Sequence, residues 1–117
     1  SGTTGEPKGV QLPHSAVVAA VASLAAALEH YDEPVGPGDS MLSYLPLAHI
    51  FDRVSEETSL AAGACIGYWS GDVARVGEDA AALKPSVFVG VPRVYDKVYD
   101  TVQHRLSGVN WLRRSIF

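Results

Sequence analysis

Short apolar runs alternate with helix-like stripes along most of this chain, and this alternation constrains its fold more than any single motif. Three runs are typical of buried strands, at 41–45, 64–69 and 87–91. A strand that is covered on both faces is nearly continuously apolar. Apolar residues recur at helical spacing in the stretches 15–28, 48–62 and 78–83, and again after Pro92. The pattern predicts an α/β fold, a layered sheet with mainly parallel strands flanked by helices.

Local signals suggest how the helices begin and end. Ser15 is a candidate N-cap for the first helix, whose apolar stripe is Val17, Val21, Leu24 and Leu28. The second helix is expected at the surface, and Gly63 is expected to end it. One side of that helix would carry Ile50, Val54, Thr58 and Ala61, and on the other Arg53 could pair with Glu56 or Glu57.

Charge and cysteine content exclude some classes of function. The net charge of −4 argues against a nucleic-acid partner, which would call for a concentrated basic patch. The single cysteine, Cys65, lies inside an apolar run and is expected to be a buried, reduced thiol. The sequence given has no run of about 20 apolar residues that could span a bilayer.

The first nine residues, S-G-T-T-G-E-P-K-G, combine three glycines, three hydroxyls and one lysine. Glycine allows a backbone to approach a ligand closely, and successive N–H groups form a concavity that binds anions. The hydroxyls add donors, and Lys8 adds a mobile charge suited to phosphate. This stretch therefore predicts a loop that wraps a polyphosphate, with a flexible linker as the alternative.

Two common phosphate loops do not fit this stretch. A Walker A loop has four residues between its glycines and then Gly-Lys-Ser/Thr. Here Gly5 and Gly9 are closer together, and Lys8 precedes a glycine. The Gly-x-Gly-x-x-Gly spacing of dinucleotide-binding folds is also missing.

A second informative segment, Y-L-P-L-A-H-I-F-D-R, follows the first predicted strand and contains His49. Ligands of open α/β sheets bind beyond the carboxyl ends of the strands. A histidine there can donate to a carboxylate or form part of a pocket wall. From the residues alone, a partly buried structural histidine is the favoured interpretation of His49.

Several segments together resemble one enzyme family. The string S-G-T-T-G-E-P-K-G-V resembles the phosphate loop of the AMP-forming acyl-adenylate synthetases. The string P-L-A-H-I-F-D-R is similar to the acyl-site motif of the long-chain acyl-CoA synthetase branch, and segments 66–72 and 84–97 resemble further parts of that branch. The resemblance runs in order from Ser1 to about Tyr99.

The resemblance implies an activity and roles for individual residues. A carboxylate would attack the α-phosphate of ATP to give an acyl-adenylate and pyrophosphate, and the thiol of coenzyme A would then displace AMP. It gives catalytic roles to Thr3, Thr4 and His49, with His49 orienting the fatty-acid carboxylate. It makes Gly90 a candidate lining residue of the acyl tunnel, with a close-packing strand glycine as the alternative. The nucleotide-binding candidates are Ser1, Gly2, Thr3, Thr4, Gly5 and Lys8.

The same resemblance sets expectations for cofactors, organisation and location. ATP, Mg²⁺ and coenzyme A are the expected cofactors and co-substrates, a long-chain fatty acid is the expected substrate, and no metal ligand is assigned within this chain. Residues 1–117 are expected to be part of a larger adenylate-forming N-terminal domain, starting within the phosphate loop, and to be inactive alone. The parent protein is expected inside the cell, at the cytoplasmic face, with peripheral attachment to the endoplasmic reticulum or peroxisome membrane. The alternatives are a truncated nucleotide-binding module without catalysis and a ligase of another acid, such as an aromatic one.

Overall fold

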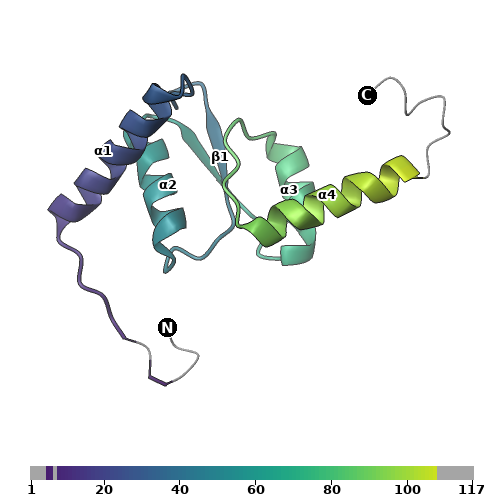
Figure 1. The fold of residues 1–117 in the computed structure, drawn as a ribbon, viewed down its shortest axis with the longest axis horizontal. Helices are drawn as coiled ribbons and strands as arrows, with labels where there is room; N and C mark the ends of the chain where they lie inside the picture. Colours follow the sequence, from purple (N-terminus) through teal and green to yellow (C-terminus); the bar gives the residue numbers. More distant parts are fainter. Residues whose placement is uncertain (1–4, 7, 108–117) are drawn as a thin grey trace.

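A computed structural model describes residues 5–6 and 8–107 of the chain. Figure 1 shows the elements in chain order. They are α1 (His14–His30), β1 (Ser40–Ser43), α2 (Ile50–Ala61), β2 (Cys65–Tyr68), the 3₁₀ helix η1 (Val73–Arg75), α3 (Val76–Leu83) and α4 (Pro92–Ser107). None of the described helices is long and apolar enough to cross a membrane.

The sheet is parallel, and β1 lies at its centre. Strands β1 and β2 pair in parallel, with Ser40 opposite Cys65 and Ser43 opposite Tyr68. On the other side of β1, Met41 forms a single parallel bridge with Val87. The consecutive residues 41–44 are all buried, as expected for a strand that is covered on both faces. The parallel strands and flanking helices confirm the predicted α/β class.

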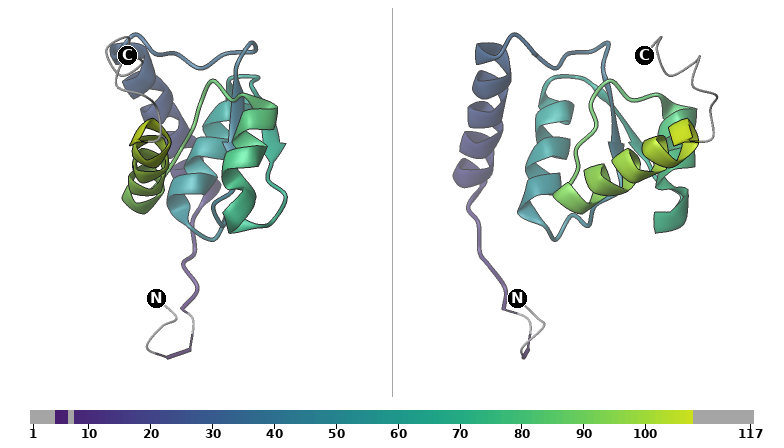
Figure 2. Two further views of the ribbon diagram at one scale, coloured as in Figure 1. Left: turned by 90° about the vertical axis from the view of Figure 1, so that its right-hand side faces the viewer. Right: turned by 45° about the vertical axis from the view of Figure 1, so that its right-hand side comes forward.

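The helices form layers on both faces of this sheet. Adjacent strand residues point to opposite faces. On the face of Met41, the Ser59 hydroxyl of α2 lies 3.4 Å from the Met41 sulfur, and α1 packs on α2 from outside (Figure 2). On the face of Leu42, α3 packs closely against Gly67. A Cβ at Gly67 would lie 2.6 Å from a Leu83 methyl, so glycine permits this approach.

The third predicted strand, 87–91, is wrong beyond Val87. Side chains form hydrogen bonds with backbone groups that would otherwise pair in a β-ladder. The Ser86 hydroxyl accepts the Ser40 N–H at 3.0 Å and donates to Asp39 at 2.7 Å. Further on, the Tyr95 hydroxyl donates to the Phe88 carbonyl at 3.2 Å. Only one backbone hydrogen bond joins the described part of this segment to β1, from the Val87 N–H to the Ser40 carbonyl at 3.0 Å, and side chains make the other contacts.

Two further local predictions are wrong, and two are confirmed. Pro13, not Ser15, is the N-cap of α1, because the Pro13 carbonyl accepts the first helical hydrogen bonds. Cys65 is exposed because it opens β2, which lies at the edge of the described sheet. Gly63 does follow the end of α2, with a positive φ of 75°. The predicted stripe of α1 is half-buried, at Val17, Val21, Leu24 and Leu28.

Candidate functional site

The predicted phosphate-binding residues are only partly covered by the structure. Ser1, Gly2, Thr3 and Thr4 lie outside the described residues. Gly5 and Lys8 are exposed, and they belong to the segment before α1, which extends away from the sheet in Figure 1. The structure therefore does not bring Gly5 or Lys8 to the edge of the sheet, and their role stays a prediction.

His49 lies beyond the carboxyl end of β1, as the position of its motif predicts. It is the N-cap of α2, with an extended backbone (φ −88°, ψ 120°). Its N–H donates to the Pro46 carbonyl at 2.8 Å, which closes the turn that leads into the helix. The His49 side chain is exposed, so the partly buried structural histidine that the residues alone favoured is not what is seen.

Gly90 packs against a cluster of aromatic rings. The Tyr44 and Phe88 rings stack with centroids 5.4 Å apart, and Tyr95 meets Phe88 edge-on at 6.4 Å. A Cβ at Gly90 would lie 3.0 Å from the Tyr95 ring and 3.1 Å from the Tyr44 hydroxyl. Any larger residue at this position would press on both rings, so close packing is part of what Gly90 does. Its predicted place in an acyl tunnel stays a prediction.

The structure brings the Gly90 and His49 segments to the same edge of the sheet. Val87 runs parallel to β1, so the residues that follow both strands emerge at the same side. Tyr44, between β1 and His49, makes the close approach to Gly90. An exposed histidine thus lies at the same sheet edge as a tightly packed aromatic cluster.

The helix that His49 begins is oriented unexpectedly. We expected α2 at the surface, but it lies between α1 and the sheet, and its polar side faces inward. The inward side carries a polar stripe at helical spacing, residues 52, 55, 56 and 59, which sequence reasoning missed although the spacing is visible. Asp52 is 1% exposed and Glu56 is 5% exposed.

The hydroxyls on this inner side are satisfied, but the carboxylates are not. Ser55 donates to the Phe51 carbonyl at 2.8 Å, and Ser59 donates to the Ser55 carbonyl at 2.9 Å. Among the described residues, three buried oxygens lack a hydrogen-bond partner: Asp52 Oδ2, Glu56 Oε1 and the Tyr44 hydroxyl. Polar groups buried in this way are rare in native proteins and call for an explanation.

Two of these buried groups, Asp52 and Tyr44, have raised pKa values. Burial and then the neighbouring Glu56 raise the pKa of Asp52, while the Ser43 hydroxyl and His49 act in the opposite direction. Burial, followed by Tyr95 and Asp52, raises the pKa of Tyr44 to about 12. Asp52 therefore lies close enough to His49 to be influenced by it, and close enough to Tyr44 to influence it.

The predicted ion pair of α2 is confirmed, but the predicted separation of apolar and charged sides is not, because Ile50 and Val54 line the same cavity as Arg53 and Glu57. Arg53 pairs with Glu57 at 3.3 Å, one of the two predicted partners. This small apolar cavity, of about 200 Å³, separates α2 from α1, and Leu12 and Ile50 both line it. Because Leu12 follows the phosphate-loop segment and Ile50 follows His49, these two parts of the chain meet at the base of α1 and α2.

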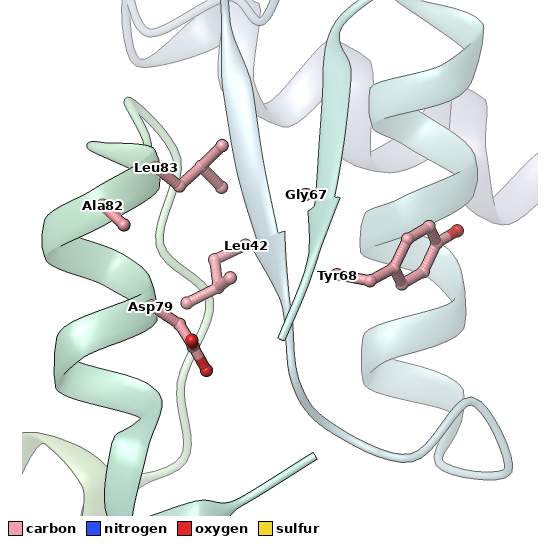
Figure 3. Close-up of a pocket in the computed structure, with 6 residues that line it drawn as sticks. All are labelled: Leu42, Gly67, Tyr68, Asp79, Ala82 and Leu83. Atoms are coloured by element: carbon pink, nitrogen blue, oxygen red, sulfur yellow. The ribbon is translucent and has the colours of Figure 1, made fainter. Parts of the chain in front are cut away.

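A second cavity, of about 270 Å³, lies between α3 and the sheet. Figure 3 shows Leu42 and Leu83 converging on it. Its charged residue, Asp79, already accepts hydrogen bonds from the Ser70 N–H and hydroxyl at 3.0 and 2.9 Å, and these bonds lower the Asp79 pKa. One oxygen of the charged group that lines this cavity, Asp79 Oδ2, is therefore already engaged.

The described part of the chain does not provide a magnesium site. Within residues 5–6 and 8–107, no group of three or more His, Cys, Asp or Glu side chains could hold a metal ion. Asp52 and Glu56 are buried side by side on one helix, without a third such ligand. We therefore derive no step through Mg²⁺ from these residues.

Comparison with known proteins gives a consistent result. The sequence profile described as "AMP-binding enzyme" matches residues 1–113. The chain is 49% identical over its full length to Long chain acyl-CoA synthetase 4 of Arabidopsis thaliana and 43% identical over its full length to Probable CoA ligase CCL6 of Humulus lupulus. Over 104 residues, 89% of the chain, it is 44% identical to Long-chain-fatty-acid--CoA ligase 5 of Rattus norvegicus.

The matches cover most or all of this chain but only a small part of each relative. The chain spans 18% of the length of the two plant proteins and 15% of the rat protein. No solved structure matches it significantly.

Proposed function

The chain belongs to the AMP-binding enzyme family, and from this membership we propose that the protein containing it is a long-chain fatty acid–CoA ligase. The observation that carries the proposal is 49% identity over all 117 residues to a long-chain acyl-CoA synthetase. The geometry adds an exposed His49 at the carboxyl edge of a parallel sheet, where α/β enzymes bind their ligands.

The proposed reaction has two steps. The fatty-acid carboxylate attacks the α-phosphate of ATP and releases pyrophosphate, and the thiol of coenzyme A then displaces AMP from the acyl-adenylate. Transfers of this type depend mainly on positioning and on stabilising charge. Magnesium would share the phosphate charge when bound.

Each candidate residue has a defined part in this proposal. The N–H groups and side chains of the first loop, including Thr3, Thr4 and Lys8, would hold the leaving phosphates. A preorganised donor of this kind contributes about 2–4 kcal/mol to transition-state stabilisation. His49 would donate to the fatty-acid carboxylate and fix its direction of attack, and Gly90 would leave room beside the acyl chain. Peripheral attachment to an intracellular membrane stays part of the proposal.

Two variants of the full-length protein test these roles separately. We expect His49→Ala to lower kcat/KM for the fatty acid by about 100-fold, because a misplaced substrate costs about that much. Lys8→Ala should instead raise the KM for ATP. Both are measured by ATP–pyrophosphate exchange with a long-chain fatty acid, and His30→Ala, at the exposed end of α1, is the matched control.

The outcomes separate the proposal from its alternatives. If neither His49→Ala nor Lys8→Ala changes the exchange rate, the assigned roles are wrong. Exchange with an aromatic acid but not with a long-chain fatty acid would replace the substrate class. ATP binding without any exchange would favour a module that has no catalytic function.

A further inference from the structure

An unexplained feature of this molecule is a buried carboxylate in the first turn of the helix that the proposed substrate-orienting histidine begins. Asp52 is 1% exposed, and its Oδ2 has no hydrogen-bond partner among the described residues. Leaving such a group unpaired is unfavourable, because it has lost its hydrogen bonds to water without gaining others. A pairing that forms only in a working state of the site would account for its presence.

The position of Asp52 in α2 suggests what that pairing is. His49 is the N-cap, so Asp52 occupies the third helical position. Side chains at these two positions reach each other across the first turn, as in a capping box. Here the His49 backbone N–H is already bonded to Pro46, so the imidazole N–H remains as the donor that Asp52 can accept.

The Ser43 hydroxyl acts on the Asp52 carboxyl, but Oδ2 still has no hydrogen-bond partner, and the other groups nearby are less suitable for it. Glu56 is a second acid and repels the charge. Arg53 is paired with Glu57 on the outer side of the helix. The Tyr44 hydroxyl is buried and packs toward Gly90. The imidazole of His49 is exposed and can rotate.

We propose that Asp52 is a positioning residue, whose buried carboxylate accepts one ring N–H of His49 and thereby directs the other ring nitrogen at the substrate carboxylate. The inference rests on the proposed function of His49 and adds the residue that fixes its orientation. A carboxylate behind a histidine sets which ring nitrogen carries the proton. Such bonds are often long in free enzymes and tighten when substrate binds.

Asp52→Asn in the full-length protein tests the inference, because it keeps the size of the side chain and removes its charge. We expect kcat for the fatty acid to fall about 10- to 100-fold, as when a carboxylate behind a functional histidine is removed. The KM for ATP should not change. Asp52→Glu should recover most of the rate, and Ser55→Ala, on the same buried side, should have no effect.

Two further readouts separate positioning from a purely structural role. In ¹⁵N NMR spectra, the His49 ring should show one dominant tautomer in the parent protein and a mixture in Asp52→Asn. In a double-mutant cycle, adding Asp52→Asn to His49→Ala should cost little more than His49→Ala alone.

Failure of the inference can be distinguished from failure of the proposed function. If His49→Ala lowers activity while Asp52→Asn leaves kcat and the tautomer unchanged, the inference is overturned and the proposed function stands. Additive losses in the double mutant also overturn it. If Asp52→Asn does not fold, Asp52→Ser is measured instead: a mixture of His49 tautomers with a lower rate supports the inference, and an unchanged tautomer overturns it.

Discussion

Helices α2 and α4 are both amphipathic, and both depart from the usual arrangement of an apolar inner side and a polar outer side. In α2 polar residues face inward, and in α4 apolar residues face the solvent. In α2 the acidic residues Asp52 and Glu56 face the sheet, at 1% and 5% exposure. In α4 the apolar residues Val98 and Tyr99 are 52% and 63% exposed. The difference comes from packing, because α2 lies between α1 and the sheet, whereas α4 is anchored near its start, through Tyr95. A periodic pattern reveals that a helix has two sides but not which side is covered.

The largest expected effect is the loss of the core residue beneath α2. Met41 is fully buried and contacts Ser59 of α2. Met41→Ala should therefore destabilise the domain by about 2–5 kcal/mol. Urea denaturation of the full-length protein measures this, with Leu60→Ala on the exposed side of α2 as the control. A loss no larger than the control would mean that α2 does not depend on this contact, and the comparison would fail.

A smaller, pH-dependent effect sharpens the comparison at Asp52. Its pKa is raised in the folded state, so the unfolded chain ionises first as the pH increases. The contribution of Asp52 to stability is therefore greatest below its unfolded pKa and declines as the pH rises through its folded pKa. Burial and Glu56 disfavour the charged form of Asp52, whereas Ser43 and His49 favour it.

Asp52→Asn isolates this contribution. The free energy of unfolding of the parent protein, relative to that of the variant, should fall with increasing pH. Thermal unfolding between about pH 3 and 8 measures this. Asp39 and Asp79, whose pKa values are lowered by hydrogen bonds, act in the opposite direction but are unchanged by the substitution. A pH-independent difference would mean that Asp52 is not held in an environment that resists its charge.

The smallest expected effect is on α4. Val98→Ala removes an exposed side chain, so we expect a change within about 0.5 kcal/mol. The measurement is the urea midpoint of the full-length protein, compared with Lys97→Ala one position earlier. A loss above about 1 kcal/mol would show that this side of α4 is covered in the longer protein, and α2 and α4 would then no longer differ.

Much of the fold could be predicted from local patterns, because those patterns depend on nearest neighbours. The continuous apolar run around Met41 predicted a strand covered on both faces, and Gly63 predicted the end of α2. The Arg53–Glu57 pair followed from helical spacing. The strand beyond Val87 failed because the Ser86 hydroxyl takes the Ser40 N–H of β1 and the Tyr95 hydroxyl of α4 bonds to the Phe88 carbonyl.

The candidate site was also only partly predictable from the sequence. The placement of His49 beyond a strand end could be predicted because parallel strands emerge at one edge of a sheet. The burial of Asp52 could not, since it depends on α1 covering the opposite side of α2. The spacing of residues 52, 55, 56 and 59 was the available signal, and an inward apolar side is the commoner arrangement.

The contact of Ser86 with β1 also has a consequence for how the chain is synthesised. Ser86 follows Ser40 by 46 residues, and ribosomes add about 5–20 residues per second. One edge of β1 therefore stays unpaired for roughly 2–9 s, until the segment that contains Ser86 has been synthesised. An unpaired strand edge can recruit other chains. During that interval a nascent molecule would depend on chaperones or on dilution to avoid pairing with another copy.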